Sequence, residues 1–416
     1  METFSPTLAE TDTLLTAGLD YYKPTMSQLA YKHEPDTQVT FTLHNRGDQR
    51  FADYLEPGQL QERFDEIQAR GWTRQETEFL GSIVVNDGQR AFSQNYQEYL
   101  RTHDLPPVEI GYDETSQDLF VETTGDWPMA MFWETQVMAD VSEYFFENYL
   151  IAHDINPVDV YNEGDRRLSE KIAVLQAHPD IRIVDFGTRR RFSLKWHEHV
   201  LERLVEECPD SLVGTSNVAL SQKFNLKPIG TFAHEMPMVY AALAEIRGQD
   251  VRESHNGFLE DWYNLYGEEY SIALTDTFGT DFFFEDFTAE QARKWRGVRQ
   301  DSGDPFVFGE QLVKFYQELG INPKSKVLVF SDNLNFRKIV DLKQQFGDRI
   351  NDLDGIGTNL TNDLGLTALN MVMKATRVRV AEASAFTVKL SDDKGKHTGP
   401  PESVALYEDK YFKVAA

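Results

Sequence analysis

Seven short apolar runs, each followed by a polar or glycine-rich loop, constrain the fold of this chain more than any other feature. The runs lie at residues 181–184, 212–213, 228–229, 272–274, 297–298, 327–330 and 356. Stretches with helical periodicity lie between them, at 196–207, 239–246, 310–319 and 335–345. Repeated strand, loop and helix units produce parallel strands, and seven or more units favour closure into a β/α barrel. Because the loops that follow the strands build the site of such a barrel, we expect the functional residues there.

The segments on either side of this region predict a second, α+β domain. Residues 39–43 alternate like a half-buried strand, helical periodicity dominates 57–100, and a turn-rich boundary follows at 125–128. The chain alternates again at 386–390 and 407–414, which predicts two further strands. The expected organisation is an N-terminal α+β domain over residues 1–128, a β/α-barrel catalytic domain over 129–366, and a C-terminal segment over 367–416 that returns to the N-terminal domain.

The acidic balance of the chain excludes some classes of partner. Its 416 residues include 41 Lys and Arg against 68 Asp and Glu, a net charge of −27. Such an excess argues against a nucleic-acid-binding surface and against docking on anionic lipid. Small anionic substrates remain possible if cationic side chains gather in one cleft. The run Arg189-Arg190-Arg191 is notable for that reason.

Cysteine content and hydropathy predict a soluble, cytoplasmic protein. The single cysteine, Cys208, cannot form an intramolecular disulfide, which fits a reducing compartment. Residues 1–18 contain no Lys or Arg and no sustained apolar segment, so we expect neither a signal peptide nor a membrane anchor. No run approaches the roughly 18 apolar residues that a membrane-spanning helix needs.

A candidate catalytic histidine lies just after the third apolar run. Gly230 and Thr231 end that run, and His234 follows where a helix could begin. Glycine lets a backbone approach a ligand closely, and threonine can cap a helix or donate to phosphate. Neutral imidazole can act as a nucleophile toward phosphoryl groups, although a histidine that only satisfies a helix end is the alternative. Glu235 adjoins His234, but neighbours on a helix do not face each other.

Three Gly-Thr steps follow apolar runs, at 214–215, 230–231 and 357–358. Backbone N–H groups at a glycine, a nearby hydroxyl and a helix N-terminus together favour phosphate oxygens. One such step is a common turn, but three in one barrel indicate a substrate with more than one phosphate.

Two other loops carry residues suited to a flat, anionic substrate. In the segment RQDSGDP, Arg299 offers a planar fork to a carboxylate, while Asp301 and Asp304 can accept ribose hydroxyls or hold Mg²⁺ through water. An ordinary polar turn is the alternative. Phe186 could be an aromatic platform for a flat ring, with Arg189 reaching phosphate, or a plain core residue.

Several other catalytic patterns are excluded. His197-Glu198-His199 lacks the i, i+4 spacing of a helical zinc site and predicts an exposed helix face. The kinase signatures that would accompany an Asp-Phe-Gly motif are missing. The chain contains no serine-nucleophile elbow, Walker A loop or dinucleotide-binding Gly-x-Gly-x-x-Gly.

Six segments together resemble the nicotinate phosphoribosyltransferase family. They lie at 20–26, 185–190, 212–218, 230–235, 299–305 and 355–359, and the resemblance runs from about residue 14 into the C-terminal region. The resemblance implies a two-domain enzyme with an irregular β/α barrel of the type II phosphoribosyltransferase kind, working as a homodimer with sites at the interface. It implies the joining of nicotinate to phosphoribosyl pyrophosphate in NAD salvage, which gives nicotinate mononucleotide and pyrophosphate.

The same resemblance implies roles for residues around the phosphates. ATP would be a co-substrate whose hydrolysis is coupled through a transient phosphohistidine at His234. Mg²⁺ and Arg189 would address the pyrophosphate, and Asp301 would hold the ribose hydroxyls. Gly357 and Thr358 would cradle the 5′-phosphate.

The pyridine ring would lie between Phe186 and Tyr22, with Tyr22 supplied by the other subunit, and Arg299 would meet the ring carboxylate. Arg46 and Lys374 are further candidates for phosphate contact.

Ser216 bears on the choice between acid and amide substrates. Similar enzymes that use nicotinamide have an aspartate at the matching position, so the neutral hydroxyl here predicts nicotinate; a helix cap is the simpler role. Three alternatives stay open for the whole chain: a nicotinamide phosphoribosyltransferase, a quinolinate phosphoribosyltransferase, and a non-catalytic barrel that binds phosphometabolites. A quinolinate enzyme would need more cationic groups and would have no use for His234 or ATP.

Overall fold

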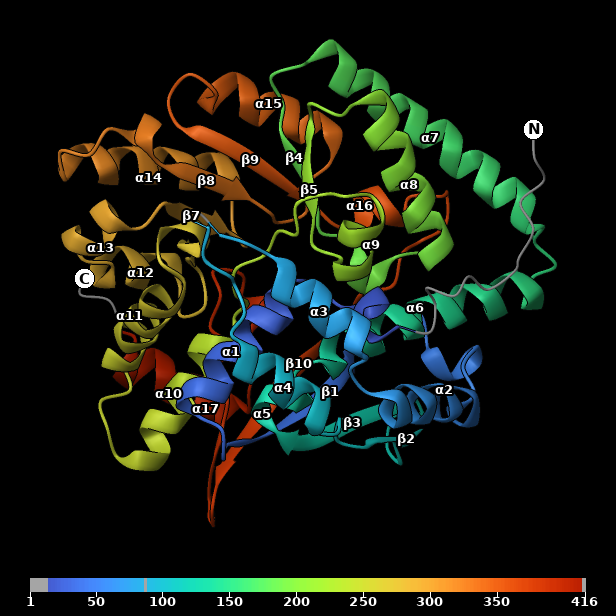
Figure 1. Ribbon diagram of the computed structural model, residues 1–416, viewed down its shortest axis with the longest axis horizontal. Helices are drawn as coiled ribbons and strands as arrows, with labels where there is room; N and C mark the ends of the chain where they lie inside the picture. Colours follow the sequence, from blue (N-terminus) through green and yellow to red (C-terminus); the bar gives the residue numbers. More distant parts are fainter. Residues whose placement is uncertain (1–13, 86–87, 414–416) are drawn as a thin grey trace.

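The computed structural model of the protein describes residues 14–85 and 88–413, and a six-stranded parallel sheet lies at its centre. The strands follow the order β5-β4-β9-β8-β7-β6. Their bounds are β4 Ile183–Asp185, β5 Leu212–Thr215, β6 Ile272–Leu274, β7 Gly297–Gln300, β8 Val327–Phe330 and β9 Asn351–Ile356. Figure 1 shows α8, α14 and α15 on the outer side of these strands. The predicted β/α barrel is confirmed.

One of the seven apolar runs does not become a strand. Pro228 forms only an isolated bridge to Thr215, because proline has no N–H to extend a ladder. Ile229 donates its N–H to the Thr215 carbonyl at 2.9 Å, and the Thr231 hydroxyl donates to the Ile272 carbonyl at 3.2 Å. This irregular segment therefore spans the gap between the edge strands β5 and β6, and the barrel has six regular strands instead of seven.

Helices form where a polar cap precedes apolar residues spaced three or four apart. In α15, the Asn335 side chain accepts the N–H of Lys338, and the buried residues are Phe336, Ile339, Leu342 and Phe346. The four helices predicted between the strands are confirmed as α8, α10, α14 and α15. The helices of this half are α7 Pro157–Ala177, α8 Leu194–Glu207, α9 Val218–Lys223, α10 Glu235–Arg247, α11 Glu253–Tyr266, α12 Thr280–Asp286, α13 Ala289–Lys294, α14 Pro305–Glu318, α15 Phe336–Phe346 and α16 Thr358–Thr361.

A five-stranded antiparallel sheet forms the second domain, in the order β11-β10-β1-β3-β2. Strand β10 from the C-terminal segment pairs with β1 near the N-terminus, so both ends of the chain build this sheet (Figure 1). The predicted α+β domain is therefore confirmed. Its elements are β1 Gln38–Asn45, β2 Val108–Tyr112, β3 Leu119–Asp126, β10 Met371–Val380, β11 Ala383–Phe386, α1 Tyr22–His33, α2 Pro57–Arg70, α3 Arg74–Ser82, α4 Gln94–Thr102, α5 Trp127–Ala130 and α6 Trp133–Ala152.

The chain after β11 does not form the two predicted strands. Residues 387–398 are mostly irregular, and helical structure follows at α17 Pro401–Leu406 and η9 Tyr407–Tyr411. Tyr407 and Phe412 are buried against Phe278 and other residues of the barrel half. The alternation at 407–414 reflects this packing against helices and not one face of a sheet; residues 414–416 lie outside the described residues.

None of the helices in the described parts of the chain is long and apolar enough to cross a membrane.

Candidate active site

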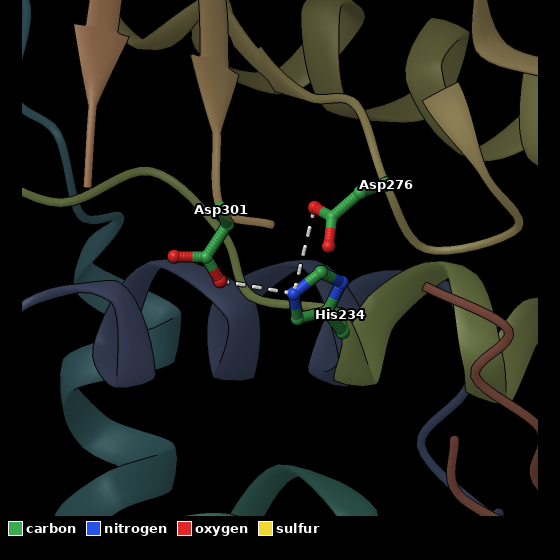
Figure 2. Close-up of side chains that lie close together, drawn as sticks. All are labelled: His234, Asp276 and Asp301. Atoms are coloured by element: carbon green, nitrogen blue, oxygen red, sulfur yellow. Dashed lines mark hydrogen bonds and ion pairs between the residues drawn. The ribbon is translucent and has the colours of Figure 1, made fainter. Parts of the chain in front are cut away.

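The N-terminus of α10 brings His234 to the loops that follow β6 and β7. The His234 Nε2 atom lies 3.1 Å from Asp301 Oδ2 and 3.8 Å from Asp276 Oδ1 (Figure 2). The Nδ1 atom lies 3.0 Å from the hydroxyl of Thr277. Lys389, from the irregular C-terminal segment, places its ammonium 2.9 Å from Nε2. Parallel strands end at one rim, which is why these distant residues meet.

This environment keeps the imidazole of His234 neutral. Burial and the positive charge of Lys389 lower its pKa to about 4, even though Asp276 and Asp301 act in the opposite direction. Burial alone would raise the pKa of the Asp301 carboxyl, but Arg299, His234 and Lys389 hold it well below its usual value. At neutral pH the site therefore contains an imidazole with a free lone pair beside a carboxylate.

The same cluster has the donor set of a metal site. Ligand atoms of His234, Asp276 and Asp301 lie within 4.8 Å of one another. Asp276 Oδ1 is buried and accepts no hydrogen bond from residues 14–85 or 88–413. Paired carboxylate oxygens are the ligands that Mg²⁺ prefers. The residues present thus fit a magnesium ion held by Asp276 and Asp301.

A cavity of about 120 Å³ lies inside the barrel and contains two of the residues expected at the pyridine ring. Phe186 and Arg299 both line it, with Gly230 and Thr231. Most of the other lining residues are apolar, and they include Val213, Ile229, Ile272, Val329 and Leu353. The Arg299 Nε atom is buried and has no hydrogen-bond partner among the described residues. An apolar cavity with one unsatisfied guanidinium N–H suits a flat ring that bears a carboxylate.

Phe186 is positioned by a buried network that the sequence did not reveal. Asp185 accepts from the Thr215 hydroxyl at 2.6 Å and pairs with His197 at 2.6 Å, and both residues of that pair are fully buried. His197 was expected on an exposed helix face, and that expectation was wrong. A Cβ atom on Gly355 would lie 2.3 Å from the Phe186 ring, so only glycine admits the ring there.

Tyr22 and Arg189 of the same chain lie side by side. The Arg189 guanidinium lies 5.9 Å from the centre of the Tyr22 ring, and it also faces Asp20 at 3.5 Å and Glu134 at 3.6 Å. A Cβ atom on Gly230 would lie 2.8 Å from the Tyr22 nitrogen. Gly230 therefore permits a close approach of Tyr22, and it also lines the cavity. Tyr22 reaches Arg189 without a second subunit.

Glu235 does not pair with His234. Its carboxylate accepts from Lys23 at 2.6 Å and from the Trp127 indole at 2.7 Å. Lys23 also pairs with Glu134 at 2.6 Å. This buried network fastens α1 and α6 to the start of α10, so it fixes the helix end that carries His234.

Cationic side chains gather around this rim. Burial, followed by repulsion from Arg189 and Lys389, lowers the pKa of Lys374 to about 8. Burial, Arg189 and Arg46 lower the pKa of Arg190 to about 10. Cations that repel one another enough to shift their pKa values create a positive potential, which attracts a polyanion. The expected gathering of cations within an acidic protein is therefore present.

The hydroxyls of the first two Gly-Thr steps have other partners. Thr215 donates to Asp185, and Thr231 donates to the Ile272 carbonyl. The hydroxyl protons of these two threonines are therefore used within the protein. Gly357 and Thr358 are half-buried, and Gly357 lies beside the carbonyl of Phe186.

Two more expectations were wrong in detail. Asp304 accepts the N–H groups of Phe306 and Val307 and so caps α14, and the acidic residues beside His234 are Asp276 and Asp301. Asn217, not Ser216, caps α9. Ser216 is buried and donates to Asp20 at 2.6 Å, outside the residues that line the cavity.

The sequence did not identify three residues beside His234, namely Thr277, Asp276 and Lys389. Asp276 follows an apolar run, as the other site residues do, and could have been recognised by that position. Lys389 lies in a stretch expected to be a strand, more than 150 positions from the histidine, and no local signal pointed to it.

Comparisons with known proteins match the whole of this architecture. The model of the nicotinate phosphoribosyltransferase family matches residues 181–413, and that of its N-terminal domain matches residues 18–142. A nicotinate phosphoribosyltransferase of Desulforapulum autotrophicum is 36% identical over 93% of this chain and 95% of its own length. One from Neisseria meningitidis serogroup A is 36% identical over 95% of this chain and 96% of its own.

Solved structures agree. The crystal structure of nicotinate phosphoribosyltransferase from Porphyromonas gingivalis superposes with a TM-score of 0.83 at 31% identity, covering 94% of this chain and 98% of that one. The Vibrio cholerae structure also has a TM-score of 0.83, at 30% identity, covering 99% of this chain and 96% of that one. By sequence and by fold, this chain belongs to the nicotinate phosphoribosyltransferase family.

Proposed function

We propose that this chain joins nicotinate to phosphoribosyl pyrophosphate in NAD salvage, with ATP hydrolysis coupled through a phosphohistidine at His234. Membership of the nicotinate phosphoribosyltransferase family supports the assignment of the overall reaction. The cavity lined by Phe186 and Arg299 is the observation that carries the substrate assignment, because the buried Nε of Arg299 lacks an acceptor that a pyridine carboxylate would provide.

The transfer step is a displacement at the anomeric carbon of the ribose. The bond from that carbon to a pyrophosphate oxygen breaks, pyrophosphate leaves with the electron pair, and the lone pair of the pyridine nitrogen forms the new bond. The sugar becomes oxocarbenium-like on the way. Arg189 would neutralise the leaving pyrophosphate, Asp301 would hold the ribose hydroxyls, and Gly357 and Thr358 would cradle the 5′-phosphate.

The ATP step uses the neutral imidazole of His234. The lone pair of a ring nitrogen forms a bond to the γ-phosphorus, the phosphorus–oxygen bond to ADP breaks, and ADP leaves with that electron pair. The proton stays on the other ring nitrogen. Water later cleaves the nitrogen–phosphorus bond and releases phosphate. The added negative charge would tighten the cationic rim around substrate and so couple ATP to affinity.

Magnesium is part of this proposal. Asp276 and Asp301 would hold the ion, and a bound Mg²⁺ would neutralise charge on the phosphates. The unpartnered Oδ1 of Asp276 supports this assignment.

We also propose a homodimer and a cytoplasmic location. The single cysteine, Cys208, supports a reducing compartment. Tyr22 lies beside Arg189 of its own chain. A pyridine ring held between Phe186 and Tyr22 of the partner subunit stays a prediction. Light scattering of the purified protein measures the oligomeric state directly.

Product analysis tests the proposed function. Nicotinate, phosphoribosyl pyrophosphate and Mg²⁺ should give nicotinate mononucleotide and pyrophosphate, and added ATP should raise the yield and be consumed. Faster turnover of nicotinamide would favour the amide enzyme and overturn the reading of Ser216. Product from quinolinate would indicate a quinolinate phosphoribosyltransferase. Binding of the substrates without any product would indicate a non-catalytic barrel that binds phosphometabolites.

Affinity for phosphoribosyl pyrophosphate should fall as the pH rises above about 8. The pKa of Lys374 in the free protein is about 8, and a phosphate ligand binds the charged form. The Michaelis constant for phosphoribosyl pyrophosphate should therefore rise by up to about tenfold per pH unit above that value, since one proton is coupled to binding. Steady-state kinetics between pH 7 and about 9.5 measure this slope. The variant Lys374→Arg, which stays charged, should abolish the slope, and equal slopes in both proteins would contradict the assignment.

A further inference from the structure

We propose that Lys389 is a catalytic residue whose ammonium binds the phosphoryl group carried by His234. The inference rests on the proposed phosphohistidine. It adds a second residue from the C-terminal segment, besides Lys374, to a site made mostly by the barrel and the N-terminal helices.

The position of Lys389 is unusual for a lysine. The residue is only 5% exposed, and its Nζ lies 2.9 Å from His234 Nε2 and 3.2 Å from Asp276 Oδ2. A buried ammonium that served only to pair with Asp276 would not need to contact an imidazole as well. Asp276 compensates part of the cost of burying this charge, and a phosphoryl group on His234 would provide a second anion within reach of the ammonium.

The distance between Lys389 and His234 suits contact with a group carried by the ring. The Nζ atom lies 2.9 Å from Nε2, so an ammonium at this position can reach the oxygens of a phosphoryl group bound to the imidazole. Phosphohistidine carries a dianionic group, which a cation stabilises through charge-assisted hydrogen bonds. Lys389 therefore favours the phosphorylated state of His234.

The backbone around Lys389 is fastened to the loops that hold the catalytic carboxylates. Leu390 donates its N–H to the Thr277 carbonyl at 2.8 Å. The Asp392 carboxylate accepts from the Thr280 N–H at 2.8 Å and from its hydroxyl at 2.6 Å. Ser391 is held at φ +58°, a left-handed conformation that a serine adopts only when its surroundings impose it. The chain thus aims the lysine at His234 with a rigid turn.

Phosphoenzyme formation from γ-labelled ATP tests the proposal. Lys389→Met removes the charge but keeps the length of the side chain, and it should lower the steady-state level of acid-labile label by about tenfold to a hundredfold. Lys389→Arg keeps a cation and should remain within about tenfold of the wild type. The matched control is Lys396→Met on the same segment: Lys396 pairs with Asp332 and Asp393, its side chain is 33% exposed, and its loss should leave the label unchanged.

The outcomes separate this inference from the proposed function. Absence of label on the wild-type protein would refute the proposed phosphohistidine, and with it the proposed function of His234. Full label on Lys389→Met, with an unchanged lifetime after ATP is removed, would refute the role of Lys389 alone. Circular dichroism verifies folding, and Lys389→Gln, which can still donate to Asp276, replaces the Met variant if that protein does not fold. If neither uncharged variant folds, a folded Lys389→Arg without label would count against the proposal.

Discussion

Replacing His234 by alanine should remove the acid-labile label that γ-labelled ATP leaves on the protein, to below about 1% of the wild-type level. Alanine has no lone pair to attack phosphorus, and no other histidine contacts the cluster of Asp276, Asp301 and Lys389 in the described structure. ATP should then no longer stimulate synthesis of nicotinate mononucleotide. The label is measured on protein denatured in alkali, where phosphohistidine is stable, before and after acid treatment.

The control for this variant is His199→Ala. His199 lies on α8 and pairs with Asp165, away from the cluster, so its loss should leave the label intact. An undiminished label on His234→Ala would show that another residue carries the phosphoryl group. Slow synthesis that persists without ATP would not contradict the assignment, because energy coupling adds to a transfer reaction that is chemically complete without it.

Replacing Arg299 by glutamine should lower kcat/KM for nicotinate by at least about thirtyfold. Removing one partner of a buried, hydrogen-bonded charge pair costs about 2–5 kcal/mol, and each 1.4 kcal/mol is tenfold. The Arg299 side chain is 15% exposed and lines the cavity together with Phe186, so the substrate carboxylate would lose the cation proposed to bind it. Nicotinamide carries no charge, so its kcat/KM should change much less. The measurement is the ratio of kcat/KM for nicotinate to kcat/KM for nicotinamide, compared between the variant and the wild type.

Arg296 also lines this cavity and offers a matched control. It precedes β7, its side chain is 44% exposed, and it faces Glu269 at 3.8 Å. Arg296→Gln removes the same charge from the same cavity lining and should change kcat/KM for nicotinate by less than about threefold, as expected of an exposed pair. An equal loss of kcat/KM for nicotinate in both variants would mean that Arg299 does not bind the substrate carboxylate specifically.

The predictable part of the fold depended on local signals. Apolar runs followed by polar loops marked six parallel strands, and capped, periodic stretches marked the helices between them. These signals act over a few residues, so they can be read along the chain. They failed where a residue breaks the ladder, as Pro228 does, and where alternation served packing against helices, as at Tyr407 and Phe412.

The structure brings together predicted site residues that lie at the ends of strands. Phe186 follows β4 and Arg299 lies near the end of β7, and both line one cavity. His234 and Asp301 lie 3.1 Å apart. The hydroxyls of Thr215 and Thr231, which were expected to face phosphate, donate instead to a carboxylate and to a carbonyl of a neighbouring strand.

The sequence by itself determined the class of fold, the acidic character, and which residue types stand at the rim of the barrel. Only the tertiary structure decided the protonation of those residues and their hydrogen-bond partners. The neutral form of His234, the lone Nε of Arg299 and the pairing of Asp185 with His197 depend on burial and on partners far away in the chain. Lys389 reaches the histidine because β10 returns to the N-terminal sheet and carries the following segment across the barrel mouth. Electrostatic interactions depend on the distance between charges and on the exclusion of water, and the amino-acid sequence alone gives neither quantity.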